Sequence, residues 1–197
     1  GTYTCQTGLM NVALMILAAG QSTRLGSPKQ LVPFRGKSLL QHTIDEAKAI
    51  GPAELMVILG ANHELIMGQI NEDPDLLIVH NHLWDEGMAS SIRSGIRHMM
   101  NRSYEAVIIL VCDQPFVTSS LLEQLVHRFR TEQHHIVAAE YDGIPGTPAL
   151  FHRSLFEELM QLKGDKGAKQ VILRHKDSAG FVGFPNGITD IDTPADV

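Results

Sequence analysis

The stretch VALMILAAGQSTRLGSPKQL, residues 12–31, decides the fold, because an apolar run leads directly into a polar loop bounded by glycines. An uninterrupted run of this kind predicts a buried strand of a parallel sheet. The loop begins at Gly20 and ends at Gly26, and Arg24 and Lys29 bring positive charge to it. Backbone N–H groups of such a loop can surround phosphate oxygens while the two cations neutralise them. The stretch therefore predicts a phosphate site, although a plain turn can have the same composition.

The loop matches neither of the two best-known phosphate motifs. A Walker A loop has four residues between its glycines and then Lys followed by Ser or Thr, whereas residues 21–25 separate the glycines here. A dinucleotide loop reads GxGxxG, and that spacing is absent as well. Pro28 stiffens the approach to Lys29. The stretch is therefore interpreted as a third, longer kind of phosphate loop.

Composition limits the class of protein. The chain has 197 residues, 44% of them hydrophobic, which is enough for one domain around one core. A net charge of −6 and the lack of a basic run argue against nucleic acid or an anionic membrane as the main partner.

With only Cys5 and Cys112, a disulfide framework is excluded and a reducing cytoplasm is the expected compartment. Neither a membrane span nor a signal peptide is predicted. Residues 1–9 are expected to be disordered or foreign to the domain, which spans 10–197.

Apolar runs alternate with amphipathic stretches along the chain. The runs end at Leu17, Leu59, His80, Cys112 and Glu140. Helices are predicted at 38–50, 62–71, 89–101, 118–132, 154–162 and 168–175, and a last short strand at 181–184. This repetition predicts a single-domain, three-layer α/β/α sandwich with a mostly parallel, mixed sheet. The predicted helix starts include Ser38, Ser90 or Ser91, and a capping box at Ser120.

Polar segments follow several of the predicted strands, and ligands of open parallel sheets bind beyond the carboxyl ends of the strands. The glycine loop, residues 84–91 and residues 113–115 are therefore expected on one rim. Asp113 either caps the next helix or binds Mg²⁺, which needs only one or two carboxylates beside water and phosphate. Asp190 and Asp192 offer a second carboxylate, and only one of them can face the metal in an extended chain.

Two further features have an ordinary structural interpretation. His80 and His82 have a spacing that can bind metal, but side chains two residues apart at a strand end are interpreted as structural or surface residues. Cys112, next to Asp113, is interpreted as a small buried hydrophobe rather than a reactive thiol.

Six strings in register resemble the MobA-like nucleotidyltransferase family, and most of all its molybdenum cofactor cytidylyltransferase branch. They are LAAGxSxRxGxPKxL, GMASSIRSG, DQP, GxPALF, GDKGAK and DIDTPxD, spread over nearly all of residues 12–197. The resemblance implies a nucleotide-diphospho-sugar transferase-like fold. It also implies a reaction in which the phosphate of an acceptor attacks the α-phosphorus of a nucleoside triphosphate and pyrophosphate leaves.

The resemblance implies roles for the loop residues. Residues 20–26, with Gln21 and Ser22 among them, would wrap the β- and γ-phosphates. Arg24 would hold the leaving pyrophosphate, and Lys29 would reach the α-phosphate. Positioning and charge stabilisation supply most of the rate in such a reaction.

The resemblance also implies a metal site. Asp113 would bind Mg²⁺, which bridges phosphates and orients the attack. Asp192, or less favourably Asp190, would complete that site.

The nucleobase is expected near Leu17, Ala18 and Ala19, and near Ser90 and Ser91. Family guanylyltransferases commonly read LAGG where this chain reads LAAG. The extra Cβ of Ala19 favours a smaller pyrimidine, and hence CTP. A difference of one methyl group sets only modest discrimination.

The acceptor is expected to bind in the second half of the domain, residues 117–197, opposite a nucleotide-binding half at 10–116. Gly146, Thr147 and Pro148 would contact it, and Lys166 and Lys169 would bind its phosphate. The two lysines fit a solvated helix start almost as well.

Three classes of function stay open. The first is transfer of CMP to a molybdopterin-type cofactor destined for a client molybdoenzyme, or the same chemistry with GTP or another triphosphate and a sugar phosphate. The second is a non-catalytic carrier of nucleotide or cofactor, which the presence of Arg24, Lys29 and Asp113 together disfavours. The third is a hydrolase or kinase, which the missing Walker A loop disfavours.

Overall fold

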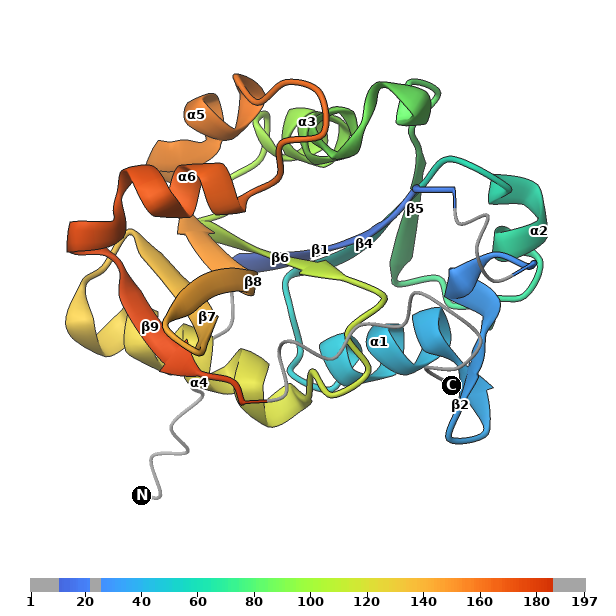
Figure 1. The fold of residues 1–197 in the computed structure, drawn as a ribbon, viewed down its shortest axis with the longest axis horizontal. Coiled ribbons are helices and arrows are strands. Elements are labelled where there is room, and N and C mark those ends of the chain that lie inside the picture. Colours follow the sequence, from blue (N-terminus) through green and yellow to red (C-terminus); the bar gives the residue numbers. More distant parts are fainter. Residues whose placement is uncertain (1–10, 22–25, 186–197) are drawn as a thin grey trace, which may run out of the picture.

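Seven strands form the central sheet of the computed structural model, which describes residues 11–21 and 26–185 (Figure 1). Their order across the sheet is β5-β4-β1-β6-β8-β7-β9. β8 pairs antiparallel with both of its neighbours, and the other pairs are parallel, so the mostly parallel, mixed sheet is confirmed. The strands are β1 (Val12–Ala18), β4 (Glu54–Leu59), β5 (Leu76–His80), β6 (Ala106–Val111), β7 (Ile136–Tyr141), β8 (Ile144–His152) and β9 (Gly180–Gly183). A separate small hairpin joins β2 (Pro33–Phe34) to β3 (Lys37–Ser38).

Helices cover both faces of the sheet, which confirms the three-layer sandwich (Figure 1). One face carries α1 (Leu39–Lys48) and α4 (Ser119–Glu132), and the other carries α3 (Met88–Met99), α5 (Phe156–Met160) and α6 (Lys169–Arg174). The short helix α2 (His63–Met67) ends earlier than predicted, at a turn through Gly68. Single 3-10 turns lie at Lys29–Leu31, Trp84–Glu86, Arg153–Leu155 and Lys176–Ser178. Within the described ranges, every helix falls short of the length and apolarity that a bilayer crossing requires.

Strand β1 is buried along its whole length because it supplies both cores. Successive side chains of a strand point to opposite faces. Leu14 and Ile16 accordingly pack in the core beneath α1 and α4, whereas Met15 and Leu17 pack beneath α3 and α5. Gly95 of α3 allows the helix to approach β1 closely, since a Cβ there would lie 2.2 Å from the terminal carbon of Met15.

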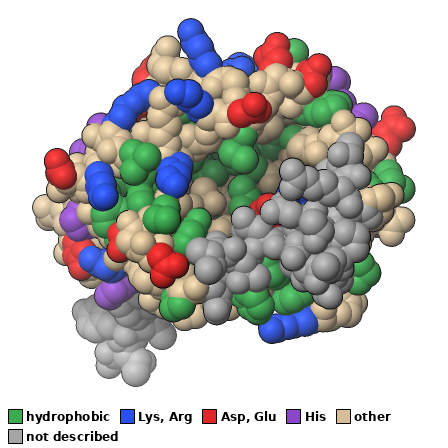
Figure 2. Space-filling view, in the orientation of Figure 1, with side chains coloured by type: hydrophobic (Ala, Val, Ile, Leu, Met, Phe, Trp, Pro, Cys, Tyr) green, Lys and Arg blue, Asp and Glu red, His purple; other side chains and the backbone are tan. Residues whose placement is uncertain are grey.

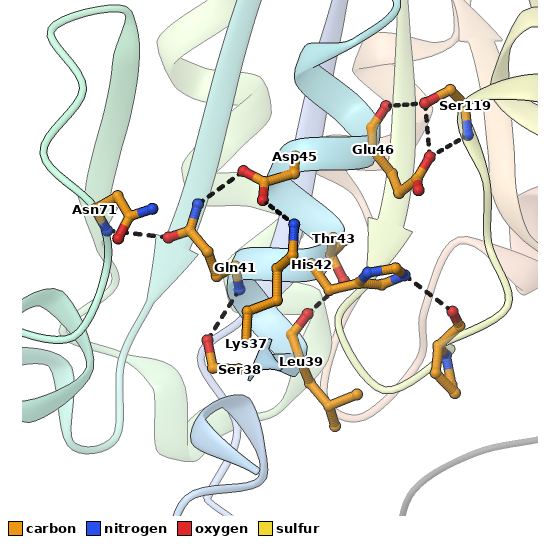
Figure 3. Close-up of polar contacts among 11 residues, drawn as sticks. Lys37, Ser38, Leu39, Gln41, His42, Thr43, Asp45, Glu46, Asn71 and Ser119 are labelled. Carbon is orange, nitrogen blue, oxygen red and sulfur yellow. Dashed lines mark hydrogen bonds and ion pairs between the residues drawn. The ribbon is translucent and has the colours of Figure 1, made fainter. Parts of the chain in front are cut away.

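Helix α1 begins at the predicted cap and is held by polar contacts along its exposed side (Figure 3). The Ser38 hydroxyl accepts a hydrogen bond from the N–H of Gln41 at 3.1 Å. The side-chain amide of Gln41 donates to Asp45 at 2.9 Å and accepts from the N–H of Asn71 at 3.0 Å. Gln41 therefore joins α1 to the segment before β5.

The predicted capping box at Ser120 is wrong, because helix α4 begins at an earlier residue. Its cap is Thr118, whose hydroxyl accepts from the N–H of Leu121 at 3.2 Å. The N–H of Ser119 donates to Glu46 of α1 at 2.7 Å, as does its hydroxyl (Figure 3). Because a tertiary partner satisfies this N–H, the helix can begin before Ser120.

Candidate functional site

A pocket of about 470 Å³ lies at the carboxyl ends of β1 and β6, beside the N-terminus of α3. Figure 2 shows that this face of the molecule is hollowed between the two helical layers, with hydrophobic side chains along the hollow. The rim predicted from the strand pattern is thus where the structure places its pocket. The predicted site residues that line it are Leu17, Ala19, Gly20, Gln21, Lys29, Ser91 and Asp113.

Lys29 and Asp113 meet at this pocket although 84 positions separate them in the sequence. The Nζ of Lys29 lies 3.1 Å from Oδ2 of Asp113, and the two side chains are 23% and 21% exposed. Lys29 begins a 3-10 turn after the glycine loop, and Asp113 follows β6. The alternative interpretation of Asp113 as a helix cap is wrong, because Thr118 caps α4.

The backbone after β1 is held on both sides. The side-chain amide of Gln30 donates to the carbonyls of Ala18 at 2.7 Å and Gly20 at 3.1 Å. The carbonyl of Ala19 accepts from the N–H of Ala61 at 2.9 Å. Ala18 is consequently buried behind the pocket and does not line it, in contrast to Ala19 and Gly20.

Gly60 sets the distance between this backbone and the opposite wall. A Cβ on Gly60 would lie 2.8 Å from the carbonyl oxygen of Ala19 and 2.4 Å from the Cβ of Trp84. The indole of Trp84, which lines the pocket, can therefore pack next to the backbone after β1 only because residue 60 has no side chain.

The N-terminus of α3 is closed by a loop from the second half of the chain. The N–H of Ala89 donates to the carbonyl of Gly164 at 3.0 Å. Gly87 has φ +105°, and a Cβ there would lie 2.5 Å from both Oδ1 of Asp165 and the carbonyl oxygen of Gly164. The chain therefore turns at Gly87 and the helix begins directly after it, so the predicted start at Ser90 or Ser91 is wrong.

Ser90 and Ser91 have separate places. Asn81 donates through Nδ2 to both hydroxyl oxygens, at 2.8 and 3.0 Å. Ser90 is buried and donates to the carbonyls of Leu83 and Gly87, so its hydroxyl serves the fold. Ser91 lines the pocket, and its oxygen accepts from Asn81. A hydroxyl that accepts from a neighbour retains a proton to donate, so Ser91 is suited to a ligand atom that accepts.

The predicted acceptor residues lie beside the pocket rather than in its lining. Gly146, Thr147 and Pro148 belong to β8, and the hydroxyl of Thr147 lies 3.5 Å from Oε1 of Gln114, next to Asp113. Lys166 and Lys169 are exposed and do not line the pocket, although their neighbour Asp165 does.

Of the remaining predicted site residues, only Gly26 is described, and it does not line the pocket. Gly26 is exposed, with φ +70°, and stands apart from the lining. Ser22, Arg24, Asp190 and Asp192 lie outside the described residues.

Sequence reasoning missed several lining residues. The rim was predicted correctly for Trp84, Asp85 and Met88, because their segment follows β5. No role in binding was predicted for them. Asp165, another lining residue, stands next to Lys166, which was chosen. Gln30 does not line the pocket but holds the backbone behind it, and it stands next to Lys29, which was also chosen. Only tertiary contacts distinguish these neighbours, so the sequence pattern offered no signal for them.

The pocket carries oxygen donors of the kind that Mg²⁺ prefers. Asp85, Asp113 and Asp165 all contribute to its lining. Across residues 11–21 and 26–185, no three His, Cys, Asp or Glu side chains converge as a metal-binding group. A hard cation that takes one or two carboxylates and completes its shell with phosphate oxygens and water fits this donor set.

Burial dominates the electrostatics of Cys112 at the pocket wall. Loss of solvent and the neighbouring Asp113 carboxylate raise the pKa of its thiol to about 12. The thiolate, which is the reactive form, is therefore scarce at neutral pH, in agreement with the interpretation of Cys112 as a small buried hydrophobe.

We expect the Cys112 thiol to make stability fall at alkaline pH. The unfolded thiol ionises near its ordinary pKa and the folded one only near 12, so unfolding releases a proton between these values. Stability from this group is complete below about pH 8.5 and is lost, by up to about 1.4 kcal/mol per pH unit, as the pH rises. Urea unfolding from pH 8 to 11 should show a steeper decline for the wild type than for Cys112→Ala. Parallel declines would contradict the assignment.

The histidines near β5 form a stack rather than a chelate. The imidazole rings of His63 and His80 stack with their centroids 3.6 Å apart, and those of His80 and His82 are 4.0 Å apart. Burial and the two neighbouring imidazoles lower the pKa of His80. His80 and His82 therefore contact each other at the end of β5, as residues of a packed ring cluster with His63.

Comparison with known proteins supports the transferase resemblance. The family model described as "MobA-like NTP transferase domain" matches residues 14–179. Nicotine blue oxidoreductase of Paenarthrobacter nicotinovorans is 30% identical over 179 residues, covering 86% of this chain and 85% of the relative. Bifunctional protein GlmU of Nitrosomonas europaea is 26% identical over 91% of this chain, but the chain spans only 39% of GlmU.

Solved structures share the fold over nearly the whole chain. The crystal structure of Rv0371c from Mycobacterium tuberculosis H37Rv has a TM-score of 0.80 at 28% identity, covering 94% of this chain and 95% of that one. Another structure of Rv0371c, with a TM-score of 0.77, is a complex with manganese and covers 94% of this chain and 95% of that one.

Proposed function

We propose a function from the premise that the chain belongs to the MobA-like NTP transferase domain family, whose model matches residues 14–179. The family places the protein among enzymes of the transferase class. The proposed reaction moves CMP from CTP to the phosphate of a molybdopterin-type cofactor. An acceptor phosphate oxygen forms a bond to the α-phosphorus, the bond from that phosphorus to the bridging oxygen breaks, and pyrophosphate leaves.

The pairing of Lys29 with Asp113 is the observation that carries the proposal. The ammonium group and the carboxylate lie 3.1 Å apart in the pocket, which is also lined by the residues directly after β1. The ammonium group can hold an α-phosphate oxygen, where negative charge grows as the new bond forms. The carboxylate can hold a cation that accompanies the triphosphate. A pocket that combines both groups suits transfer at phosphorus better than simple storage of a nucleotide.

Asp113 is the proposed ligand for Mg²⁺, with Asp192, or less favourably Asp190, as the second carboxylate. Bound Mg²⁺ would neutralise phosphate charge and fix the phosphate geometry. The remaining work belongs to the protein. Residues 20–26 would surround the β- and γ-phosphates, and Arg24 would hold the pyrophosphate as it leaves.

The base is proposed to lie between Leu17, Ala19 and Ser91, all of which line the pocket. The carbonyl of Ala19 is held by Ala61, so its methyl group has a fixed place. The Ser91 hydroxyl can donate to a base acceptor such as O2 or N3 of cytosine. These features favour CTP, and GTP is the alternative.

We expect Ala19→Gly to shift nucleotide preference toward GTP. Removing one methyl group beside the base should change the ratio of kcat/KM for CTP to that for GTP by about tenfold. The ratio is measured by pyrophosphate release with each nucleotide in turn. Ala47→Gly, in α1 and away from the pocket, is the control and should leave the ratio unchanged. An unaltered ratio in Ala19→Gly would remove the proposed basis of base selection.

The acceptor is proposed to approach from the second half of the chain, residues 117–197. Thr147 lies beside Gln114 and hence near Asp113, and the loop at residues 164–165 reaches the pocket wall. Lys166 and Lys169 follow that loop in the sequence, are exposed, and are proposed to attract the acceptor's phosphate. A sugar phosphate in place of molybdopterin is the main alternative, since the nucleotide side of the pocket does not select the acceptor.

A substrate panel tests the proposal. Purified protein with Mg²⁺ is given each of the four nucleoside triphosphates together with molybdopterin or one of several sugar phosphates, and pyrophosphate is measured. The proposal predicts acceptor-dependent release that is fastest with CTP and molybdopterin. Release with a sugar phosphate alone would move the protein to the alternative acceptor, and no acceptor-dependent release with any pair would overturn the transferase assignment.

A further inference from the structure

Gln30 places a buried amide directly behind the loop that lines the pocket. Gln30 follows Lys29 in the same 3-10 turn, and the residue is 2% exposed. The Nε2 atom donates to the carbonyls of Ala18 at 2.7 Å and Gly20 at 3.1 Å. The two carbonyls fix the orientation of the amide, because the reverse orientation would set an oxygen against two acceptors.

Stability alone does not explain this amide. Among the residues that the structure describes, no donor reaches the buried Oε1 of Gln30. A buried acceptor without a partner is destabilising. The two hydrogen bonds made by Nε2 are therefore accompanied by a destabilising, unpartnered Oε1 in the same amide. What these hydrogen bonds contribute is the orientation of the backbone that they hold.

The held carbonyls determine where the neighbouring N–H groups point. In a trans peptide the C=O and N–H groups point in opposite directions. The bond from Gln30 to the carbonyl of Gly20 thus turns the N–H of Gln21 away from Gln30. Gln21 lines the pocket, so an N–H of this residue that does not face Gln30 can serve a ligand bound there. The bond from Ala61 to the carbonyl of Ala19 likewise fixes the next peptide, so that the N–H of Gly20 points away from Ala61.

We propose that Gln30 is a positioning residue for nucleotidyl transfer: it fixes the peptide between Gly20 and Gln21 so that the Gln21 N–H donates to a triphosphate oxygen. The inference rests on the proposed function and adds a residue to it. Consecutive residues of one turn thereby serve one triphosphate, Lys29 through its charge at the α-phosphate and Gln30 through the backbone that it holds for the β- and γ-phosphates. A backbone donor fixed before the ligand binds needs no reorganisation at the moment of reaction.

Binding measurements on Gln30→Met test the inference. The variant keeps the volume of the side chain but loses the donor. The probe is the α,β-methylene analogue of CTP with Mg²⁺, measured by calorimetry, with the GTP analogue in parallel. We expect the Kd for the triphosphate analogue to rise about tenfold, the effect of one oriented hydrogen bond. The Kd for CMP, which lacks the β- and γ-phosphates, should change less than twofold.

Gln41→Met is the matched control. Gln41 is a second buried glutamine, and it lies on α1 (Figure 3). Unlike Gln30, it makes hydrogen bonds through both ends of its amide. This variant should lose a similar amount of thermal stability and keep wild-type affinity for both probes. Equal weakening of triphosphate and CMP by Gln30→Met would indicate general damage to the pocket and overturn the positioning role, as would unchanged triphosphate affinity.

Amide hydrogen exchange of the wild type provides a test that needs no variant. Addition of the Mg²⁺ complex of the triphosphate analogue should slow exchange at the N–H of Gln21, followed by NMR, whereas CMP should not. No slowing at Gln21 with the analogue bound would contradict the inference while leaving nucleotidyl transfer intact. Absence of analogue binding by the wild type would instead count against the proposed function, and this inference would fail with it.

Discussion

We expect Asp113→Ala to abolish pyrophosphate release while the protein remains folded, which is the largest effect expected of any single substitution. Asp113 is the only proposed metal ligand whose position is described, and it lies in the pocket against Lys29. Loss of the carboxylate removes a ligand for the cation that accompanies the triphosphate, and it removes a negative charge from beside Lys29. We expect kcat to fall by at least about a thousandfold, comparable to the loss of a major electrostatic contribution to a transition state. The rate is measured with saturating CTP, Mg²⁺ and acceptor.

A second ion pair supplies the control for Asp113→Ala. Lys48 and Asp73 lie 2.6 Å apart on the exposed surface, before β5 and away from the pocket. Asp73→Ala removes a carboxylate from a lysine in the same way and should retain the wild-type rate. A near-normal rate for Asp113→Ala, with circular dichroism unchanged, would show that the metal assignment is wrong.

Lys29→Met should have the second-largest effect, a fall in kcat of at least about a hundredfold with a smaller change in the KM for CTP. The ammonium group is assigned to the α-phosphate, whose negative charge grows in the transition state, so its removal affects the transition state more than the bound substrate. Methionine retains most of the length of the side chain without its charge. The split between kcat and KM is measured by varying CTP at saturating acceptor.

Lys48→Met is the matched control, because it breaks the Lys48–Asp73 pair outside the pocket. It should change neither parameter. A large rise in KM with unchanged kcat in Lys29→Met would assign Lys29 to ground-state binding of the triphosphate instead of to the reacting phosphorus.

The architecture could be predicted because buried parallel strands have a continuous apolar sequence. The run at residues 12–18 is buried on both faces of the sheet, and its length and position were evident without coordinates. The reversed strand β8 had a signal that was overlooked. Asp142 and Gly143 connect β7 to β8 with φ values of 52° and 73°, as in the tight hairpins that Asp-Gly favours.

Helix boundaries were predicted less well, since tertiary partners replaced the local caps. Ser38 caps α1 as expected, within its own segment. At α4 the side chain of Glu46, from another helix, takes the N–H of Ser119. At α3 the carbonyl of Gly164 takes the N–H of Ala89. A sequence pattern cannot anticipate a partner that is more than seventy positions away.

The same limit explains which parts of the site were predicted. Lys29 and Asp113 were recognisable because each follows a strand at the carboxyl end of the sheet and each carries a charge that suits phosphate chemistry. Gln30 carries no charge that would have indicated phosphate chemistry. Its importance comes from two carbonyls behind the loop, which only the folded chain brings to its amide.

The fold leaves the reaction to be decided by the site. Among the relatives, one of similar length bears the name of an oxidoreductase, at 30% identity. Shared architecture therefore does not establish the chemistry, whereas the groups that face the reacting atoms do. In this chain Lys29 and Asp113, which meet in the pocket, are the groups on which the proposed transfer at phosphorus depends.

The destination of the α-phosphorus tests nucleotidyl transfer most directly. CTP labelled with ³²P at either the α- or the γ-position is incubated with Mg²⁺, acceptor and protein, and the products are separated. The account predicts that α-label appears in the acceptor product and that γ-label appears in pyrophosphate. Transfer of γ-label to the acceptor, release of labelled inorganic phosphate from the γ-position, or an acceptor that never carries α-label would contradict it.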